Sequence, residues 1–151
     1  MSYREPQAES PCRIYVNRHF VVEQCRDCAI PGYLIVSPLQ EAMTLAQLDA
    51  GALHSLGPTL ALATAALEEV IKPVKTYCAQ FGEGHGRIHF HVFPRTTEIT
   101  LAYLADRPGQ GRIIRGPVLL DWARDRYRTT RPSQGVTETI EKLRHAFPDA
   151  A

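Results

Sequence analysis

The chain has 151 residues, with 17 lysines and arginines against 16 aspartates and glutamates, so its formal net charge is +1. This length is typical of a single domain with a substantial core, and the balanced charge argues against bulk attraction to nucleic acid or to an anionic membrane. No uninterrupted apolar run approaches the roughly 18 residues of a membrane span, and residues 1–5 are too polar for a secretory signal, so we expect a cytoplasmic location.

The first part of the chain is typical of β-strands. Apolar positions alternate through residues 12–23, which indicates one or two strands interrupted near Asn17 and Arg18. Residues 33–36 form a short apolar run. Pro31 and Gly32 precede this run and Pro38 follows it, and these turn-forming residues predict a further strand between them. A hairpin is the simplest connection between these strands.

A helical pattern then runs from about residue 44 to residue 71, where apolar side chains recur at steps of three and four. Gly57 and Pro58 are expected to divide or kink this helix. A strand over residues 74–79 follows, and then a glycine-rich turn over residues 82–86.

The next strand carries the most informative pattern in the chain. In an extended strand, Arg87, His89 and His91 lie on one face, while the apolar residues between them lie on the other. A half-buried strand with a polar, solvated side would show the same alternation. The glycine-rich turn before it favours a functional interpretation, because its backbone N–H groups can approach an anion closely, and a neutral histidine can act as a nucleophile.

The last third of the chain predicts helices around residues 101–104, 118–126 and 136–145, separated by turns rich in proline and glycine. Strands, a long helix, strands and then helices predict an α+β fold, with the long helix packed across one face of the sheet. The helical tail either completes a pocket or serves a dimer interface.

The four cysteines offer one pair with the spacing of a metal or redox site, Cys25 and Cys28. Reduced structural thiols are the default in a reducing compartment. We see no acidic cluster that would hold a divalent cation, so we predict no metal and no cofactor.

Three blocks of this sequence resemble the histidine-triad (HIT) superfamily of nucleotide hydrolases and transferases. Residues 87–93 are similar to its signature, in which three histidines alternate with apolar residues; residues 31–38 are similar to its Pro-Gly-His strand, and residues 76–82 to a strand that brings a polar residue to the phosphates. The resemblance implies a HIT-like five-stranded antiparallel sheet within a single domain, 1–151. Its core would span 12–95, its helical extension 96–151, and two copies would form a homodimer.

The resemblance also implies a mechanism. The middle histidine, His89, would attack the α-phosphorus of a nucleotide and form a nucleotidyl-histidine, while His91 would bind the phosphate oxygens and stabilise charge. A dinucleoside polyphosphate such as diadenosine tetraphosphate, or a nucleoside phosphoramidate, is the expected substrate.

The sequence departs from the family pattern at three positions. Arg87 replaces the first histidine and is predicted to bind phosphate together with Gln80 and His85. Tyr33 replaces the histidine after Pro-Gly and is predicted to contact the nucleotide. Cys25 stands where the family has a polar residue near the ribose, and Asp27, two residues on and on the same face of an extended segment, is predicted to take that role. His85 is either an exposed loop residue or a general acid folded back over the phosphates.

Two alternatives to a hydrolase remain open. One is a nucleotide-binding regulatory protein with reduced or lost catalysis, and the other is a small zinc-stabilised interaction module built on the cysteine pair.

Overall fold

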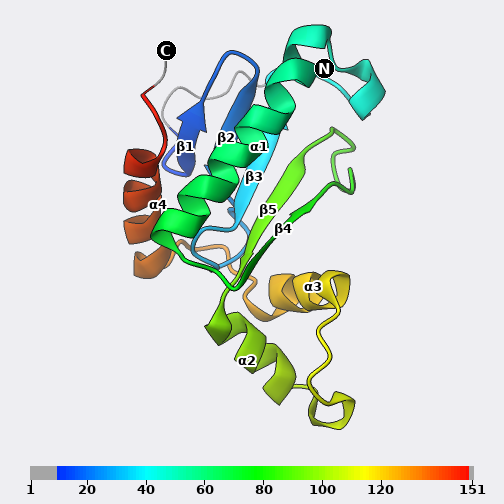
Figure 1. The fold of residues 1–151 in the computed structure, drawn as a ribbon, viewed down its shortest axis with the longest axis vertical. Coiled ribbons are helices and arrows are strands. Elements are labelled where there is room, and N and C mark those ends of the chain that lie inside the picture. The colour runs from blue at the N-terminus through cyan, green and yellow to red at the C-terminus, as the bar shows by residue number, and fades with distance from the viewer. Residues whose placement is uncertain (1–9, 150–151) are drawn as a thin grey trace.

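One antiparallel sheet, in the order β1-β2-β3-β5-β4, forms the centre of the computed structural model, which describes residues 10–149. The strands are β1 (Arg13–Val16), β2 (Phe20–Gln24), β3 (Leu34–Pro38), β4 (Lys75–Ala79) and β5 (Phe90–Arg95). The helices are α1 (Ala50–Val70), α2 (Thr97–Ala105), α3 (Gly116–Arg126) and α4 (Gln134–Ala146), and two short 3-10 turns are η1 (Leu45–Gln47) and η2 (Pro108–Gln110). The predicted α+β class and five-stranded sheet are confirmed (Figure 1).

The predicted interruption of the first strand is confirmed at a tight turn. The side-chain oxygen of Asn17 accepts hydrogen bonds from the backbone N–H groups of His19 (2.9 Å) and Phe20 (2.8 Å). Asparagine is suited to this position because its short side chain can bond the backbone two or three residues further on. The turn directs β2 back along β1.

The long helix differs from its prediction in two ways. It begins at Ala50 rather than near residue 44, because the Asp49 carboxylate caps it by accepting a hydrogen bond from the Ala52 N–H (2.8 Å). It also continues without interruption through Pro58, so the predicted division there is wrong. Burial of the helix face against the sheet outweighs the roughly 3 kcal/mol that an internal proline costs.

The first hydrophobic cluster lies between the sheet and α1, with α4 beside it. Helix α1 contacts β2, β3, β5 and α4, and it crosses the sheet diagonally in Figure 1. Three of its buried residues are alanines, Ala52, Ala63 and Ala66, so the helix approaches Val22, Val36 and the other sheet residues closely. By length and composition alone this helix is apolar enough to cross a membrane, at a mean hydropathy of 1.2, but core helices pass the same test.

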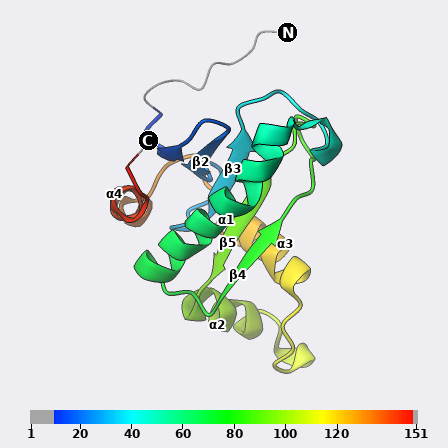
Figure 2. The same cartoon turned by 45° about the horizontal axis from the view of Figure 1, so that its top comes forward.

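A second hydrophobic cluster covers part of the opposite face of the sheet. Tyr33 and Phe93 belong to it, and they pack with side chains from α2 and α3. Figure 2 shows α1 in front of the sheet and α3 behind it. The sequence predicted a polar face on the side of the strand that carries the histidines. This face is apolar over much of its area, because side chains from the helical extension pack against it.

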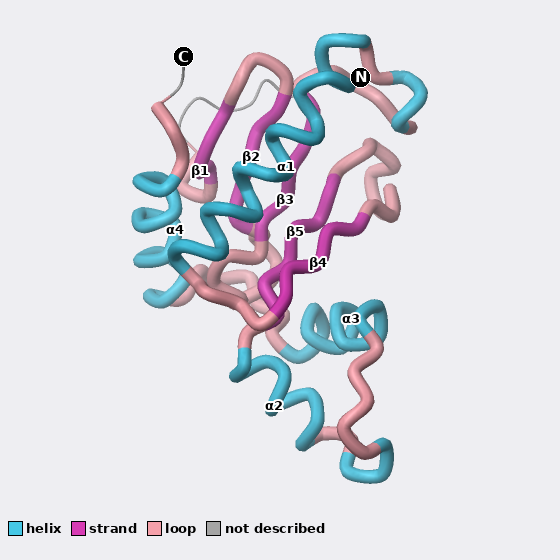
Figure 3. Tube along the Cα trace, viewed as in Figure 1, coloured by secondary structure: helices cyan, strands magenta, loops and turns pink. Residues whose placement is uncertain are grey.

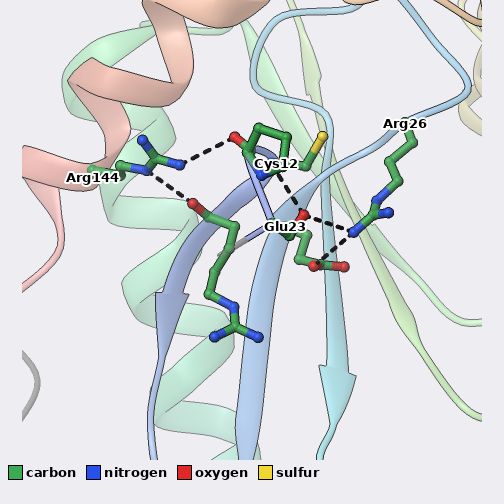
Figure 4. A network of polar contacts seen from close by, with 7 residues as sticks. Cys12, Glu23, Arg26 and Arg144 are labelled. Carbon is green, nitrogen blue, oxygen red and sulfur yellow. Dashed lines mark hydrogen bonds and ion pairs between the residues drawn. The ribbon is translucent and has the colours of Figure 1, made fainter. Parts of the chain in front are cut away.

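Helix α4 is tied to the start of the sheet by polar contacts. The Arg144 guanidinium donates to the backbone carbonyls of Arg13 (2.9 Å) and Pro11 (3.1 Å), as Figure 4 shows. Nearby, Arg26 donates to Ser10 (2.8 Å). The two Arg144 bonds hold α4 along the edge strand β1, where Figure 3 places it.

The strand that carries the histidines begins later than the sequence predicts. β5 starts at Phe90, whereas residues 87–89 lie outside the ladder, because Gly84 and Gly86 adopt positive φ angles that only glycine takes up readily. Within the strand, His91 pairs with Ile35 of β3 and with Ala79 of β4. His91 is thereby fixed in the middle of the sheet, while Arg87 follows the turn.

Candidate active site

A cavity of about 810 Å³ opens where the ends of β3 and β5 meet the glycine-rich turn and α3. Five of the seven predicted site residues line it: His89, His91, His85, Tyr33 and Asp27. Residues far apart in the sequence are therefore gathered at one site.

His89 presents one ring nitrogen as a base. Its Nδ1 lies 2.9 Å from the backbone carbonyl oxygen of Arg87, and a carbonyl can only accept a hydrogen bond. Nδ1 therefore carries the proton in the neutral ring, and Nε2 keeps its lone pair. This is the tautomer that a nucleophilic histidine needs.

His91 is buried and bonded to the phenol of Tyr33. The Tyr33 hydroxyl lies 2.6 Å from His91 Nδ1, and both side chains are almost wholly removed from solvent. Burial raises the pKa of Tyr33 above its usual value, so the phenol stays protonated. Because a phenol O–H is a stronger donor than a neutral imidazole N–H, we assign the shared hydrogen to Tyr33 and the accepting lone pair to His91 Nδ1.

The electrostatic environment keeps His91 neutral. Burial lowers its pKa to about 4, and the neighbouring His89 and Arg124 act in the same direction. Since Nδ1 accepts from Tyr33, the single ring proton is on Nε2. His91 is therefore a fixed hydrogen-bond donor beside His89, whose ring centroid is 4.9 Å away.

His85 lies over His89 although it is an exposed loop residue. Their ring centroids are 5.1 Å apart, and His85 Nδ1 accepts a hydrogen bond from the Arg87 backbone N–H (3.0 Å). Burial, His89 and Arg87 together lower the pKa of His85. In this geometry its Nε2–H is free to donate, so the loop places a second neutral donor near His89.

Two predicted phosphate-binding residues do not line the cavity. The Arg87 guanidinium instead pairs with Glu41 (3.2 Å), and Gln80 is exposed outside the lining. Both residues flank the glycine-rich turn, whose bends redirect the chain in a way that strand periodicity does not anticipate. Their predicted role in phosphate binding stays a prediction.

Cys25 and Cys28 line the cavity. Asp27, which lies between them in the sequence, lines it as well. A hydrogen bond from the Cys28 thiol lowers the pKa of Cys25 to about 7, and the same contact raises the pKa of Cys28. Both cysteines are free. Among residues 10–149 no group of three or more histidine, cysteine or acidic side chains could hold a metal ion.

The sequence left open whether the helical tail completes a pocket or serves a dimer interface, and helix α3 of this tail lines the cavity. Pro117, Leu120, Asp121 and Arg124 line the cavity from this helix, and Phe81 lines it from the end of β4, with its ring 5.6 Å from His91. The spacing of the α3 residues marks a single helix face. The sequence did not indicate which residues of the tail would face the site.

The architecture and this site define a class of fold. The chain has the fold of the histidine-triad superfamily, as its similarity to solved structures shows. A histidine triad protein from Bradyrhizobium japonicum is 19% identical with a TM-score of 0.63, and the match covers 89% of each chain. A Hit-like protein involved in cell-cycle regulation from Bartonella henselae is 17% identical with a TM-score of 0.61, covering 92% of this chain and 88% of the other.

A nucleotide hydrolase is among the similar structures. Diadenosine triphosphate hydrolase from Plasmodium falciparum is 12% identical with a TM-score of 0.53, and the match covers 66% of this chain and 80% of the other. No protein-family model matches this chain, and no curated protein matches it.

Proposed function

We propose that this protein is a nucleotide hydrolase or transferase that attacks the α-phosphorus of a dinucleoside polyphosphate or a nucleoside phosphoramidate. The observation that carries the proposal is the tautomer of His89, whose Nε2 lone pair faces a cavity that also holds the donors of His91 and His85. A neutral imidazole fixed in this way can attack phosphorus when nearby donors stabilise the phosphate oxygens.

In the first step, His89 Nε2 forms a bond to the α-phosphorus, and the bond from phosphorus to the leaving group breaks. A polyphosphate leaves as its anion, whereas an amine leaves with a proton taken up from solvent. The positive charge that develops on the ring is stabilised through Nδ1–H by the Arg87 carbonyl. The Nε2–H groups of His91 and His85 donate to the α-phosphate oxygens. The product is a nucleotidyl-His89.

In the second step, water attacks the phosphorus and the bond to Nε2 breaks. The water oxygen becomes part of the released nucleoside monophosphate, its proton passes to solvent, and the imidazole regains its lone pair. Another acceptor with a nucleophilic oxygen or nitrogen would give transfer instead of hydrolysis.

The test is steady-state hydrolysis of diadenosine tetraphosphate and of an adenosine phosphoramidate. We expect His89→Ala to lower kcat by at least about 10³-fold, since it removes the nucleophile. His54→Ala, at an exposed position on α1, is the matched control and should leave kcat unchanged. Equal rates in the wild type and His89→Ala would remove His89 from the mechanism.

A nucleotide-binding regulatory protein with reduced catalysis is the second candidate. The pairing of Arg87 with Glu41 favours it, because a guanidinium held by a carboxylate contributes less to binding a phosphate. Binding of nucleotides without turnover in the wild type would select this function.

We also propose that the chain acts as one domain in a homodimer in the cytoplasm. Strand β4 forms an edge of the sheet, and the neighbouring side chains of Val74 and Phe81 are more than half exposed. An uncovered edge strand can pair with another chain. Light scattering on the purified protein would give the mass of a dimer, and a monomer mass would reject this assembly.

A further inference from the structure

Arg124 is the cavity-lining arginine whose guanidinium forms no ion pair within residues 10–149. Its side chain is exposed, and no hydrogen bond or ion pair engages its guanidinium there. The other two arginines of the lining are paired: Arg26 with Glu23 (3.3 Å) and Arg128 with Asp125 (2.6 Å). A positive charge is thus available to a ligand at the α3 side of the cavity.

The placement of Arg124 is fixed by the packing of α3. Leu119, Leu120 and Ala123 of this helix are buried in the second hydrophobic cluster, which also contains Tyr33. One turn of the same helix therefore anchors its inner face, while Arg124 points its charge toward the cavity. After burial, this charge is the largest influence on the pKa of Tyr33, and it also lowers the pKa of His91, so it acts at the site itself.

The rest of the site offers little positive charge to a polyphosphate. His91 is neutral at pH 7, and Arg87 is held by Glu41 outside the lining. The cavity wall also includes the carboxylates of Asp27, Glu83 and Asp121. A chain of phosphates that extends beyond the α-phosphate therefore needs a cation, and a guanidinium can bind such oxygens through two parallel hydrogen bonds.

We propose that Arg124 binds the phosphates beyond the α-phosphate, so that the preferred ligand is a nucleoside polyphosphate or dinucleoside polyphosphate rather than a phosphoramidate. This inference rests on the proposed function, because it assumes that the nucleotide lies with its α-phosphate at His89. The neutral donors of His91 and His85 also favour a polyphosphate as the leaving group. A polyphosphate leaves as a stable anion, whereas an amine must take up a proton to leave.

The first experiment measures binding without chemistry. Isothermal titration calorimetry compares AMP with α,β-methylene ATP, whose bond to the α-phosphorus resists cleavage, on the wild type, Arg124→Ala, Arg124→Lys and Arg126→Ala. Arg126 lies on the same helix outside the cavity lining and is the matched control. We expect Arg124→Ala to weaken the methylene analogue about tenfold and AMP by about twofold or less.

The variants separate charge from geometry and from folding. Arg124→Lys should retain part of the preference, because it keeps the charge but loses the planar fork, and Arg126→Ala should match the wild type. Equal weakening of both nucleotides by Arg124→Ala, or no weakening, would overturn the inference while leaving the proposed function intact. Failure of the wild type to bind either nucleotide would reject both.

The second experiment measures selectivity in turnover. Arg124→Ala should lower kcat/KM for diadenosine tetraphosphate about tenfold and that for the adenosine phosphoramidate by about twofold or less. An equal loss with both substrates would assign Arg124 to the α-phosphate or to folding, and the inference would be wrong.

Discussion

The hydrogen bond from Tyr33 to His91 makes the replacement Tyr33→Phe a sharp perturbation. Phenylalanine keeps the ring, which packs edge-on against Phe93 at a centroid distance of 5.3 Å, and removes only the hydroxyl. His91 Nδ1 then remains buried without its donor. The ring is free to change tautomer or rotate, so its Nε2–H is no longer fixed.

The structure sets the size of the effect. A buried acceptor that loses its partner costs about 1–3 kcal/mol. We therefore expect the free energy of unfolding to fall by about that amount. We also expect kcat/KM to fall by about 5-fold to 150-fold, the equivalent range for the loss of one oriented donor.

The assays are chemical denaturation, steady-state kinetics and ¹⁵N NMR of the histidine rings. In the wild type, the NMR shifts should show His91 protonated on Nε2 alone at pH 7. Tyr103→Phe is the control, because Tyr103 is buried in the same cluster and no hydrogen bond engages its hydroxyl within residues 10–149. If Tyr33→Phe behaved like Tyr103→Phe in all three assays, Tyr33 would not position His91.

Three further outcomes follow from the local environments. His91 has a pKa of about 4 in the folded state and 6.5 in the unfolded chain, so the unfolded state binds more protons between these two pH values. The free energy of unfolding should therefore fall by on the order of 3 kcal/mol from pH 7 to pH 4. His91→Gln should flatten that part of the plot of unfolding free energy against pH. The alkylation rate of Cys25 should be half-maximal near pH 7, and Cys28→Ala should move that midpoint upward in a pH series with iodoacetamide; an unmoved midpoint would contradict the thiol hydrogen bond. Gly32→Ala should lower the unfolding free energy by roughly 1–3 kcal/mol, because φ is +83° and the new Cβ would lie 2.9 Å from an isoleucine carbon, whereas Gly109→Ala, with open space around it, should be nearly neutral by thermal denaturation.

The sheet was predictable because its signals are local. Alternation and turn residues marked the strands, and the interruption at Asn17 is confirmed. Local signals misled in two places. Pro58 is a helix breaker by its own chemistry, but packing against the sheet keeps α1 whole. The alternation of residues 87–93 begins three residues before the real strand, since the positive φ angles of the glycines that precede the strand are set by the folded turn.

The site was predictable only in part because its key contacts join distant residues. The bond between Tyr33 and His91 spans 58 positions, and the sequence showed only a tyrosine where the family has a histidine. Arg124 lies on a helix whose charged residues resemble an ordinary solvated face. Arg87 was predicted to bind phosphate because the pattern places it on the same strand face as the histidines. In the structure the glycine-rich turn places its guanidinium beside Glu41 instead.

The covalent nucleotidyl-His89 intermediate can be detected by mass spectrometry of the intact protein, quenched during incubation with diadenosine tetraphosphate and with an adenosine phosphoramidate. We expect an adenylyl adduct on His89 that decays as nucleotide is released, and no adduct in His89→Ala or His89→Gly. Nucleotide binding with neither adduct nor product in the wild type would contradict the proposed covalent mechanism and would identify the protein as a nucleotide-binding one.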